Sequence, residues 1–242
     1  MKLTTLRTIT PAPGLSMHDI FLYAAISTLY LIGGYYAFGK LHPESFQTTK
    51  PRAWILTLLL NVILLPTTTK YIRDYVWKWN ERAMFSDDEQ SRAATTFFIV
   101  FLILDLLFAA IDYPDRMKLL DGWIHHFVYV CFMSFILLKG WSISAMTTFP
   151  LEYPTAVMAI GNIFPSWRSD LMFGFSFFCF RILYHSYLLW KWLNIESPPM
   201  QLWPVCLMVL LLHFYWFSLW CSGPGKVLIR KMFRVSTKKA QR

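Results

Sequence analysis

Long apolar runs separated by short polar stretches make up most of the chain. A helix of ~20 mostly apolar residues crosses a hydrocarbon core of ~30 Å, and several runs reach that length. The pattern therefore predicts an all-α, polytopic membrane protein. About seven transmembrane helices are expected, at residues 17–39, 53–71, 93–111, 119–138, 141–163, 171–193 and 202–220.

The fifth run has the weakest membrane signal. Pro150, Glu152, Pro154 and Gly161 interrupt it, and a broken helix is tolerated at membrane depth only where it is buried in protein or lines a cavity. The longest hydrophilic connection, 71–92, carries charges of both signs. We expect it to be a solvated loop, with a segment lying at the membrane interface as the alternative.

The composition supports the membrane assignment. Hydrophobic residues make up 56% of the 242 residues and charged residues 15%, whereas soluble proteins carry about 25% charged residues. The apolar runs leave no room for a separate soluble domain, so one membrane domain is expected. Four cysteines lie in or beside apolar runs without metal or redox spacing, and we interpret them as small buried residues: Cys131, Cys179, Cys206 and Cys221.

The formal net charge of +9 is concentrated in part at the C-terminus. Residues 226–242 contain seven Lys or Arg and no acidic residue. By the positive-inside rule this tail is expected in the cytosol, and seven spans then put the N-terminus on the other side of the membrane. The tail is also expected to attract anionic lipid headgroups. Topology explains the charge, so no nucleic-acid partner is expected.

Several ionisable side chains stand inside the apolar runs, where each costs ~2.5–3.5 kcal/mol on insertion scales. Such residues are retained mainly where they line a cavity or take part in chemistry. We therefore interpret them as a candidate site. They are Asp105, Asp121, His125, His126, Glu152, Arg181 and His185.

The fourth run indicates which chemistry these residues suit. At ~100° per residue, Asp121, His125 and Tyr129 form one stripe of a helix, and His126 lies on its flank. A neutral imidazole accepts a proton while a carboxylate orients its other nitrogen, as general acid–base catalysis requires. Asp121 is equally suited to cap the helix. The alternative for the histidines is that neighbouring helices satisfy them as ordinary buried polar groups.

Ion pairing and metal binding are the remaining interpretations. Arg181 and His185 lie one helical turn apart on one face, and Arg181 is also suited to a structural ion pair with Glu152. Histidine and carboxylate suit iron or zinc. The six histidines of the chain form no repeated clusters, however, so neither a metal nor a resident cofactor is expected.

Three segments taken in order resemble the TLC-domain family, which includes ceramide synthases, translocating-chain-associating membrane proteins and lipid-homeostasis proteins. They are DGWIHHFVYV, FPLEYPTAVMAIGNIFP and FGFSFFCFRILYHSYLLWKWL. The resemblance covers about residues 52–220. It implies a six-helix barrel around a lipid-accessible cavity (52–222), preceded by a tail, one extra helix and a loop (1–51), followed by the basic tail (223–242), in the endoplasmic reticulum or a nearby secretory membrane.

The resemblance also implies roles for particular residues. In ceramide synthases the paired histidines take part in transfer of an acyl group from coenzyme A to a sphingoid amine, a role that would fall on His125 and His126. In that hypothesis Asp105 or Asp121 would be the orienting carboxylate. This chain departs from that pattern, because only Lys139 is charged between the histidines and Glu152. The other candidates would contact lipid or substrate: Asp121, Tyr129, Glu152, Arg181 and His185.

The expected function is lipid homeostasis through binding of a lipid or acyl chain in a histidine-lined cavity. One alternative is a ceramide-synthase-like N-acyltransferase, for which acyl-CoA would be the co-substrate. Another is a non-enzymatic cargo receptor or assembly partner in the secretory membrane, whose protein partners the sequence does not identify.

Overall fold

The computed structural model describes residues 16–78, 81–194 and 202–227, and these residues form helices and connecting turns without a β-strand. Six helices within them are long and apolar enough to cross a membrane, which agrees with the expected all-α, multi-pass fold. Their bounds are Met17–Leu41, Thr49–Trp77, Glu89–Ile111, Gly122–Lys139, Asp170–Leu193 and Trp203–Gly225. Most of the basic tail lies outside the described residues.

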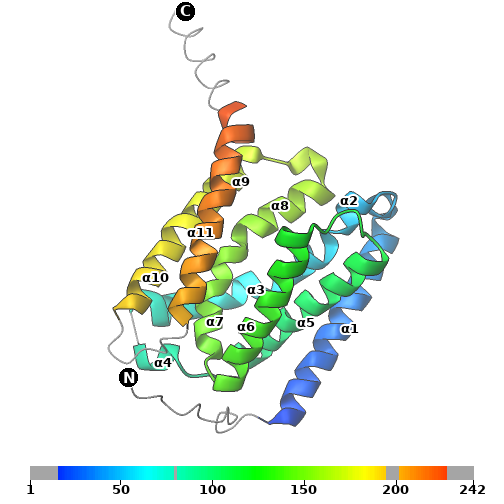
Figure 1. The fold of residues 1–242 in the computed structure, drawn as a ribbon. Helices are drawn as coiled ribbons and strands as arrows, with labels where there is room; N and C mark the ends of the chain where they lie inside the picture. Colours follow the sequence, from blue (N-terminus) through cyan, green and yellow to red (C-terminus); the bar gives the residue numbers. More distant parts are fainter. Residues whose placement is uncertain (1–15, 79–80, 195–201, 228–242) are drawn as a thin grey trace, which may run out of the picture. The chain divides into compact units, whose positions relative to one another are not determined.

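By its internal contacts the chain divides into two compact units, which we call unit 1 (Met1–Phe149) and unit 2 (Pro150–Arg242) and describe separately. In unit 1, α1 packs on α3 and α5, and α5 also packs on α6 and α7; Figure 1 shows α1, α5 and α6 side by side. The N-terminal helix thus shares a unit with its neighbours. The bounds are α1 Met17–Leu41, α3 Ile55–Tyr71, α5 Glu89–Ile111, α6 His125–Lys139 and α7 Ser142–Thr148.

The core of unit 1 is aromatic where α5 meets its neighbours. Phe97, Phe98 and Phe101 are buried on α5, and the Phe98 ring lies 5.0 Å from that of Phe149. Small and hydroxylated residues of α5 and α7, such as Thr95 on α5, are buried beside them. Small side chains allow helices in a membrane to approach closely, so the sequence of α5 suits its central position.

Within the connection 71–92, the residues that the structure describes are more helical than the expected solvated loop. The helix of α3 continues as a π-helical turn, η2 (Ile72–Trp77), and a short helix, α4 (Glu81–Met84), follows. Asp88 then caps α5: its side chain accepts a hydrogen bond from Ser91 N, while Ser91 Oγ accepts from Asp88 N. This reciprocal pairing satisfies free N–H groups of the first turn and starts the helix four residues before its apolar run.

The fifth expected span is helical but broken. α7 ends at Thr148, the 3₁₀ turn η4 (Phe149–Glu152) follows, and α8 (Tyr153–Ile163) begins beside Pro154. The predicted interruption is therefore confirmed, while a full crossing by this segment stays a prediction. Before it, α6 ends at Gly140, whose φ of 69° lies in the left-handed region that glycine adopts without strain.

Unit 2 contains α8 and two longer helical segments. α8 packs on α9 (Asp170–Ser176) and on the π-helical η6 (Phe177–Tyr184), and α10 (His185–Leu193) packs on α11 (Leu202–Trp220). A Cβ atom at Gly174 would overlap the ring of Trp220, so this glycine permits the close approach of α9 to the end of α11. The remaining turns are η1 Pro43–Phe46, α2 Thr49–Arg52, η3 Leu119–Ile124, η5 Pro165–Trp167 and η7 Cys221–Gly225.

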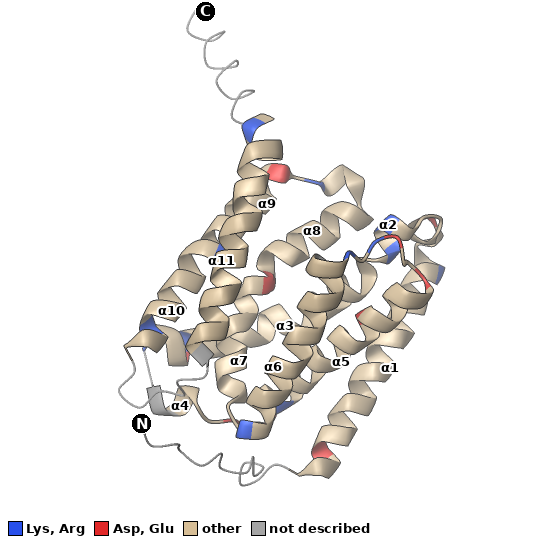
Figure 2. Cartoon of the chain, in the orientation of Figure 1, with Lys and Arg blue, Asp and Glu red and all other residues tan. Residues whose placement is uncertain are grey.

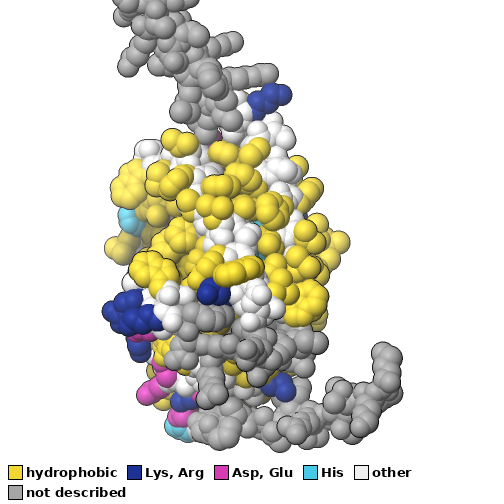
Figure 3. Space-filling view, turned by 90° about the vertical axis from the view of Figure 1, so that its left-hand side faces the viewer, with side chains coloured by type: hydrophobic (Ala, Val, Ile, Leu, Met, Phe, Trp, Pro, Cys, Tyr) yellow, Lys and Arg dark blue, Asp and Glu magenta, His cyan; other side chains and the backbone are white. Residues whose placement is uncertain are grey.

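The charged residues lie mainly at helix ends and in connections (Figure 2). Hydrophobic side chains make up most of the described surface on the face that Figure 3 shows. Phe21 and Leu29 of α1, for example, are exposed. Such apolar outer surfaces are what a lipid environment requires of membrane-spanning helices.

Candidate functional site

His126 lies between two hydrogen-bond acceptors in unit 1. Its Nδ1 atom is 2.9 Å from the carbonyl oxygen of Gly122, one turn earlier, and its Nε2 atom is 3.0 Å from Oδ2 of Asp105 on α5. The side chains of His126 and Asp105 are both mostly buried. The sequence predicted these residues as site candidates, and the packing of α6 on α5 brings them into contact.

Tyr113 completes the surroundings of the Asp105 carboxylate. Its hydroxyl donates a hydrogen bond to Asp105 Oδ1 at 2.7 Å, and both residues are buried. Burial, together with the neighbouring Asp105 carboxylate, raises the pKa of Tyr113 well above its ordinary value. The phenol therefore keeps its proton and acts as a fixed donor to Asp105.

These contacts determine the number of protons that the pair holds. The Gly122 carbonyl can only accept, so Nδ1 of His126 must carry a hydrogen. One further proton lies between Nε2 and Asp105 Oδ2, since otherwise two lone pairs would face each other. Both ring nitrogens of His126 are therefore engaged by these two contacts. A catalytic role for His126 stays a prediction.

His125 has different surroundings from its neighbour. Its ring lies against Tyr129, with ring centroids 4.5 Å apart, and 5.6 Å from the ring of His126. The side chains of His125, His126 and Tyr129 are all partly exposed. Both ring nitrogens of His126 already contact Gly122 and Asp105, so His125 is the histidine that we consider for contact with a ligand.

Asp121 does not cap the helix. The helical turn η3 begins at Leu119, and the residue before it is Lys118, so Asp121 lies inside the turn rather than at its start. The capping alternative is wrong because the π-helical turn extends α6 toward the N-terminus. The side chain of Asp121 is outside what the structure describes.

The Asp105–His126 pair lies near one end of its helices rather than at their middle. His126 is seven residues from Leu119, where its helical segment begins, and Asp105 is six residues from Ile111, where α5 ends. At ~1.5 Å per residue these separations are about 11 and 9 Å. The pair therefore lies closer to one end of its helices than to the other.

Arg181 in unit 2 contacts the helix break that follows Phe149. Its Nε donates to the carbonyl oxygen of Leu151 at 2.9 Å, and its Nη2 donates to Thr155 Oγ1 at 2.6 Å. Glu152 Oε1 is 3.9 Å from Nη2, at the outer limit of an ion pair. The structure thus brings the two predicted residues together, and the hydrogen bonds to the break are the closer contacts.

His185, predicted from the sequence, pairs with His213 across α10 and α11. Their Nδ1 atoms are 3.1 Å apart, and both side chains are buried. His185 also makes a hydrogen bond with the backbone of Cys206. One imidazole must donate and the other accept, so at least one of the two rings is neutral at the shared nitrogen.

The predicted residues therefore fall into two groups in different units. Asp105, His125, His126 and Tyr129 belong to unit 1, and Glu152, Arg181 and His185 belong to unit 2. Their convergence on one cavity stays a prediction. The sequence interpretation missed three partners, Tyr113, Thr155 and His213, of which only the last carried a signal, as a histidine within an apolar run.

Among the described residues, no three His, Cys, Asp or Glu side chains are grouped as ligands for one metal ion. Comparisons of the chain with protein-family models, with curated proteins and with solved structures found no match.

Proposed function

We propose that this chain is a TLC-like membrane protein of lipid homeostasis that binds a lipid at the His125–Tyr129 face of α6. In this proposal the Asp105–His126 pair holds that face in place, and His125 contacts the polar part of the lipid. The proposal includes seven spans, a six-helix barrel around the bound lipid, a secretory-pathway membrane and a cytosolic C-terminus.

One observation supports the proposal most strongly. A histidine–carboxylate pair is buried among apolar helices, and directly beside it a second histidine remains partly exposed. Burying charged or polar groups costs free energy that apolar residues of similar size would not. Their presence at the depth of lipid ester and amide groups therefore favours a role in binding such groups.

Lipid retention by the purified full-length chain tests this function. Gentle detergent extraction followed by mass spectrometry of bound lipid is expected to find a retained lipid in the natural protein. His125→Ala should reduce the retained amount at least about fivefold, the loss expected for one hydrogen bond to a charged or strongly polar group. The temperature of unfolding should not change, because His125 is only partly buried.

His18→Ala is the matched control, since His18 is exposed at the start of α1. It should retain lipid like the natural protein. A natural protein without bound lipid, or equal retention in the His125 and His18 variants, would contradict the proposed function.

An acyltransferase activity is the second candidate. It is favoured by the position of His125 beside the Asp105–His126 pair, in which both ring nitrogens of His126 are already engaged. In that case His125 alone, and not both histidines, would serve as base or acyl acceptor. Labelled acyl-CoA and sphingoid bases with the purified chain test this directly. Formation of an acylated amide by the natural chain, and its loss in His125→Ala, would establish an enzyme. If no amide forms that depends on His125, the chain binds lipid without transferring an acyl group.

A further inference from the structure

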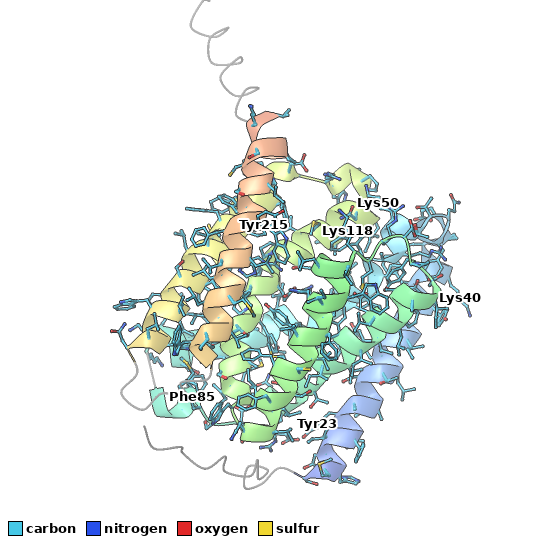
Figure 4. All side chains as sticks on the ribbon, viewed as in Figure 1. Tyr23, Lys40, Lys50, Phe85, Lys118 and Tyr215 are labelled. Atoms are coloured by element: carbon cyan, nitrogen blue, oxygen red, sulfur yellow. The ribbon has the colours of Figure 1, made fainter. Side chains whose placement is uncertain are left out.

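Unit 1 has two ends that differ in how their cations are paired. The α2 end contains α2, the last turn of α1 and the connection from α5 to η3. The α4 end contains α4, the start of α1 and the start of α5. Figure 4 shows Lys40, Lys50 and Lys118 at the α2 end, opposite Tyr23 and Phe85 at the α4 end.

At the α4 end, each cation whose side chain the structure describes has a partner. Arg73 and Lys78 pair with Asp74, Lys70 pairs with Asp88, and Arg92 pairs with Asp87. Lys139 lies over the ring of Phe135. The positive charge of this end is largely neutralised by the protein itself.

At the α2 end the arginines are paired but the lysines are not. Arg52 pairs with Asp112, and Arg116 pairs with Asp115. Lys40, Lys50 and Lys118 are exposed and form no ion pair with any residue that the structure describes. Three ammonium groups at one end of the unit are thus available to an external anion.

The residues beside these lysines identify the surroundings. Leu41 follows Lys40 directly and is 78% exposed; Leu119 follows Lys118 and is 70% exposed; Ile111, at the end of α5, is 83% exposed. Exposed apolar side chains next to exposed lysines are typical of a membrane interface, where the chain end meets lipid and the ammonium group extends to the headgroups.

We propose that the α2 end of unit 1 binds the headgroups of anionic phospholipids. The lysines supply the charge for the phosphate, and Leu41, Ile111 and Leu119 contact the upper part of the acyl chains. The Asp105–His126 pair lies about 9–11 Å from this end of its helices. A phospholipid held by the lysines therefore brings its ester groups to the depth of His125. Anionic phospholipid is then the lipid class that the proposed function requires, and this link rests on the proposed function.

Lipid selectivity of the full chain in reconstituted vesicles tests the proposal. Spin-labelled phosphatidylserine and phosphatidylcholine report the association of each lipid with the protein surface. In the natural chain we expect phosphatidylserine to associate about threefold more strongly than phosphatidylcholine. The preference should fall in Lys40→Gln, Lys50→Gln, Lys118→Gln to the lower level that the basic tail alone supports.

The matched control is Lys70→Gln, Lys78→Gln, Lys139→Gln, which removes the same charge from the α4 end and keeps the basic tail. It should retain the preference, because those lysines are already partnered. No preference in the natural chain, equal preference in the two variants, or loss of preference on adding inorganic phosphate at constant ionic strength would overturn the proposal. This measurement needs no retained lipid, so its failure is distinct from the failure of the His125→Ala test.

Discussion

Units 1 and 2 each contain ionisable groups inside apolar helices, but their partners are of different kinds. In unit 1, Asp105 and His126 bind each other near one end of their helices. In unit 2, Arg181 donates to the backbone carbonyl of Leu151 at a broken helix. Arg181 lies 11 residues from Asp170 and 12 from Leu193, about 17 Å from either end, and so near the middle of its candidate span.

This difference in partners indicates a structural role for Arg181 and a different role for the Asp105–His126 pair. Arg181 donates to the backbone carbonyl of Leu151 at the helix break, and a carbonyl within a membrane-spanning region needs such a donor. Asp105, His126 and Tyr113 mainly satisfy one another, so apolar residues in all three places would leave no comparable defect. We infer that Arg181 is retained for the fold and the Asp105–His126 pair for binding.

The largest effect is expected at Arg181. Arg181→Leu should lower the free energy of unfolding by about 3–5 kcal/mol, since it leaves the Leu151 carbonyl without its donor and the mostly buried Glu152 without its cation. Unfolding by sodium dodecyl sulfate in mixed micelles measures this. Arg116→Leu, at an exposed pair, should change stability by less than about 0.5 kcal/mol.

A second change to the Arg181→Leu chain distinguishes backbone support from simple ion pairing. Adding Glu152→Leu should restore little stability, because the Leu151 carbonyl would still lack a donor. Full recovery in the double variant would mean that Arg181 serves Glu152 alone, and the contrast between the two units would then disappear.

The next largest effect is expected in unit 1. Asp105→Leu should cost about 2–3 kcal/mol, because it leaves the Tyr113 hydroxyl and His126 Nε2 buried without a partner. The triple change Asp105→Leu, His126→Phe, Tyr113→Phe should recover most of that loss and still abolish lipid retention. A triple variant that stays as unstable as the single one would show that the pair, like Arg181, is structural.

The outlines of both regions could be predicted from the sequence, but their partners could not. Apolar runs are long and continuous, so each of the six described candidate spans overlaps an expected one, and their ends differ by at most six residues. The start of α5 was missed by four residues because its first turn is polar and depends on the Asp88–Ser91 pairing. A hydropathy pattern does not contain this pairing, although both residues stand in the sequence.

Hydrogen-bond partners on different elements could not be predicted from residue spacing either. Tyr113 reaches Asp105 only because the chain turns after Asp112, whose carboxylate is bound by Arg52 and Tyr35. His213 meets His185 through the packing of α11 on α10. Helical periodicity relates residues on one helix, and these contacts join different elements.

The histidine pair of unit 2 offers a smaller, third test. It joins two side chains, as in unit 1, but both are imidazoles and at least one of them is neutral at the shared nitrogen. A double-mutant cycle of His185→Ala and His213→Ala should give a coupling of about 1 kcal/mol, the value of a neutral hydrogen bond. Coupling near zero would show that the two rings pack without an energetically significant hydrogen bond.

The smallest effect is expected at Asp88. Like Arg181, its side chain makes a hydrogen bond to the backbone, but it lies just outside a candidate span. Hydrogen bonds from Tyr71 and Ser91 outweigh the opposing effect of burial and lower the pKa of Asp88 below its ordinary value of 3.8. A lowered folded-state pKa stabilises the fold above the unfolded-state value, and the contribution is lost as pH falls through the folded-state value. Asp88→Ala should therefore cost about 0.5–1 kcal/mol at neutral pH.

The cost of Asp88→Ala should be constant from neutral pH down to about pH 5 and should shrink below about pH 4. Asp88→Asn should retain most of the stability without that pH dependence, because an amide oxygen caps a helix nearly as well as a carboxylate. The same unfolding titration, repeated across this pH range, measures both. We expect an uncharged cap to suffice at Asp88 and no uncharged residue to replace Arg181. That outcome would show that the guanidinium is needed because water cannot supply hydrogen-bond donors inside a bilayer.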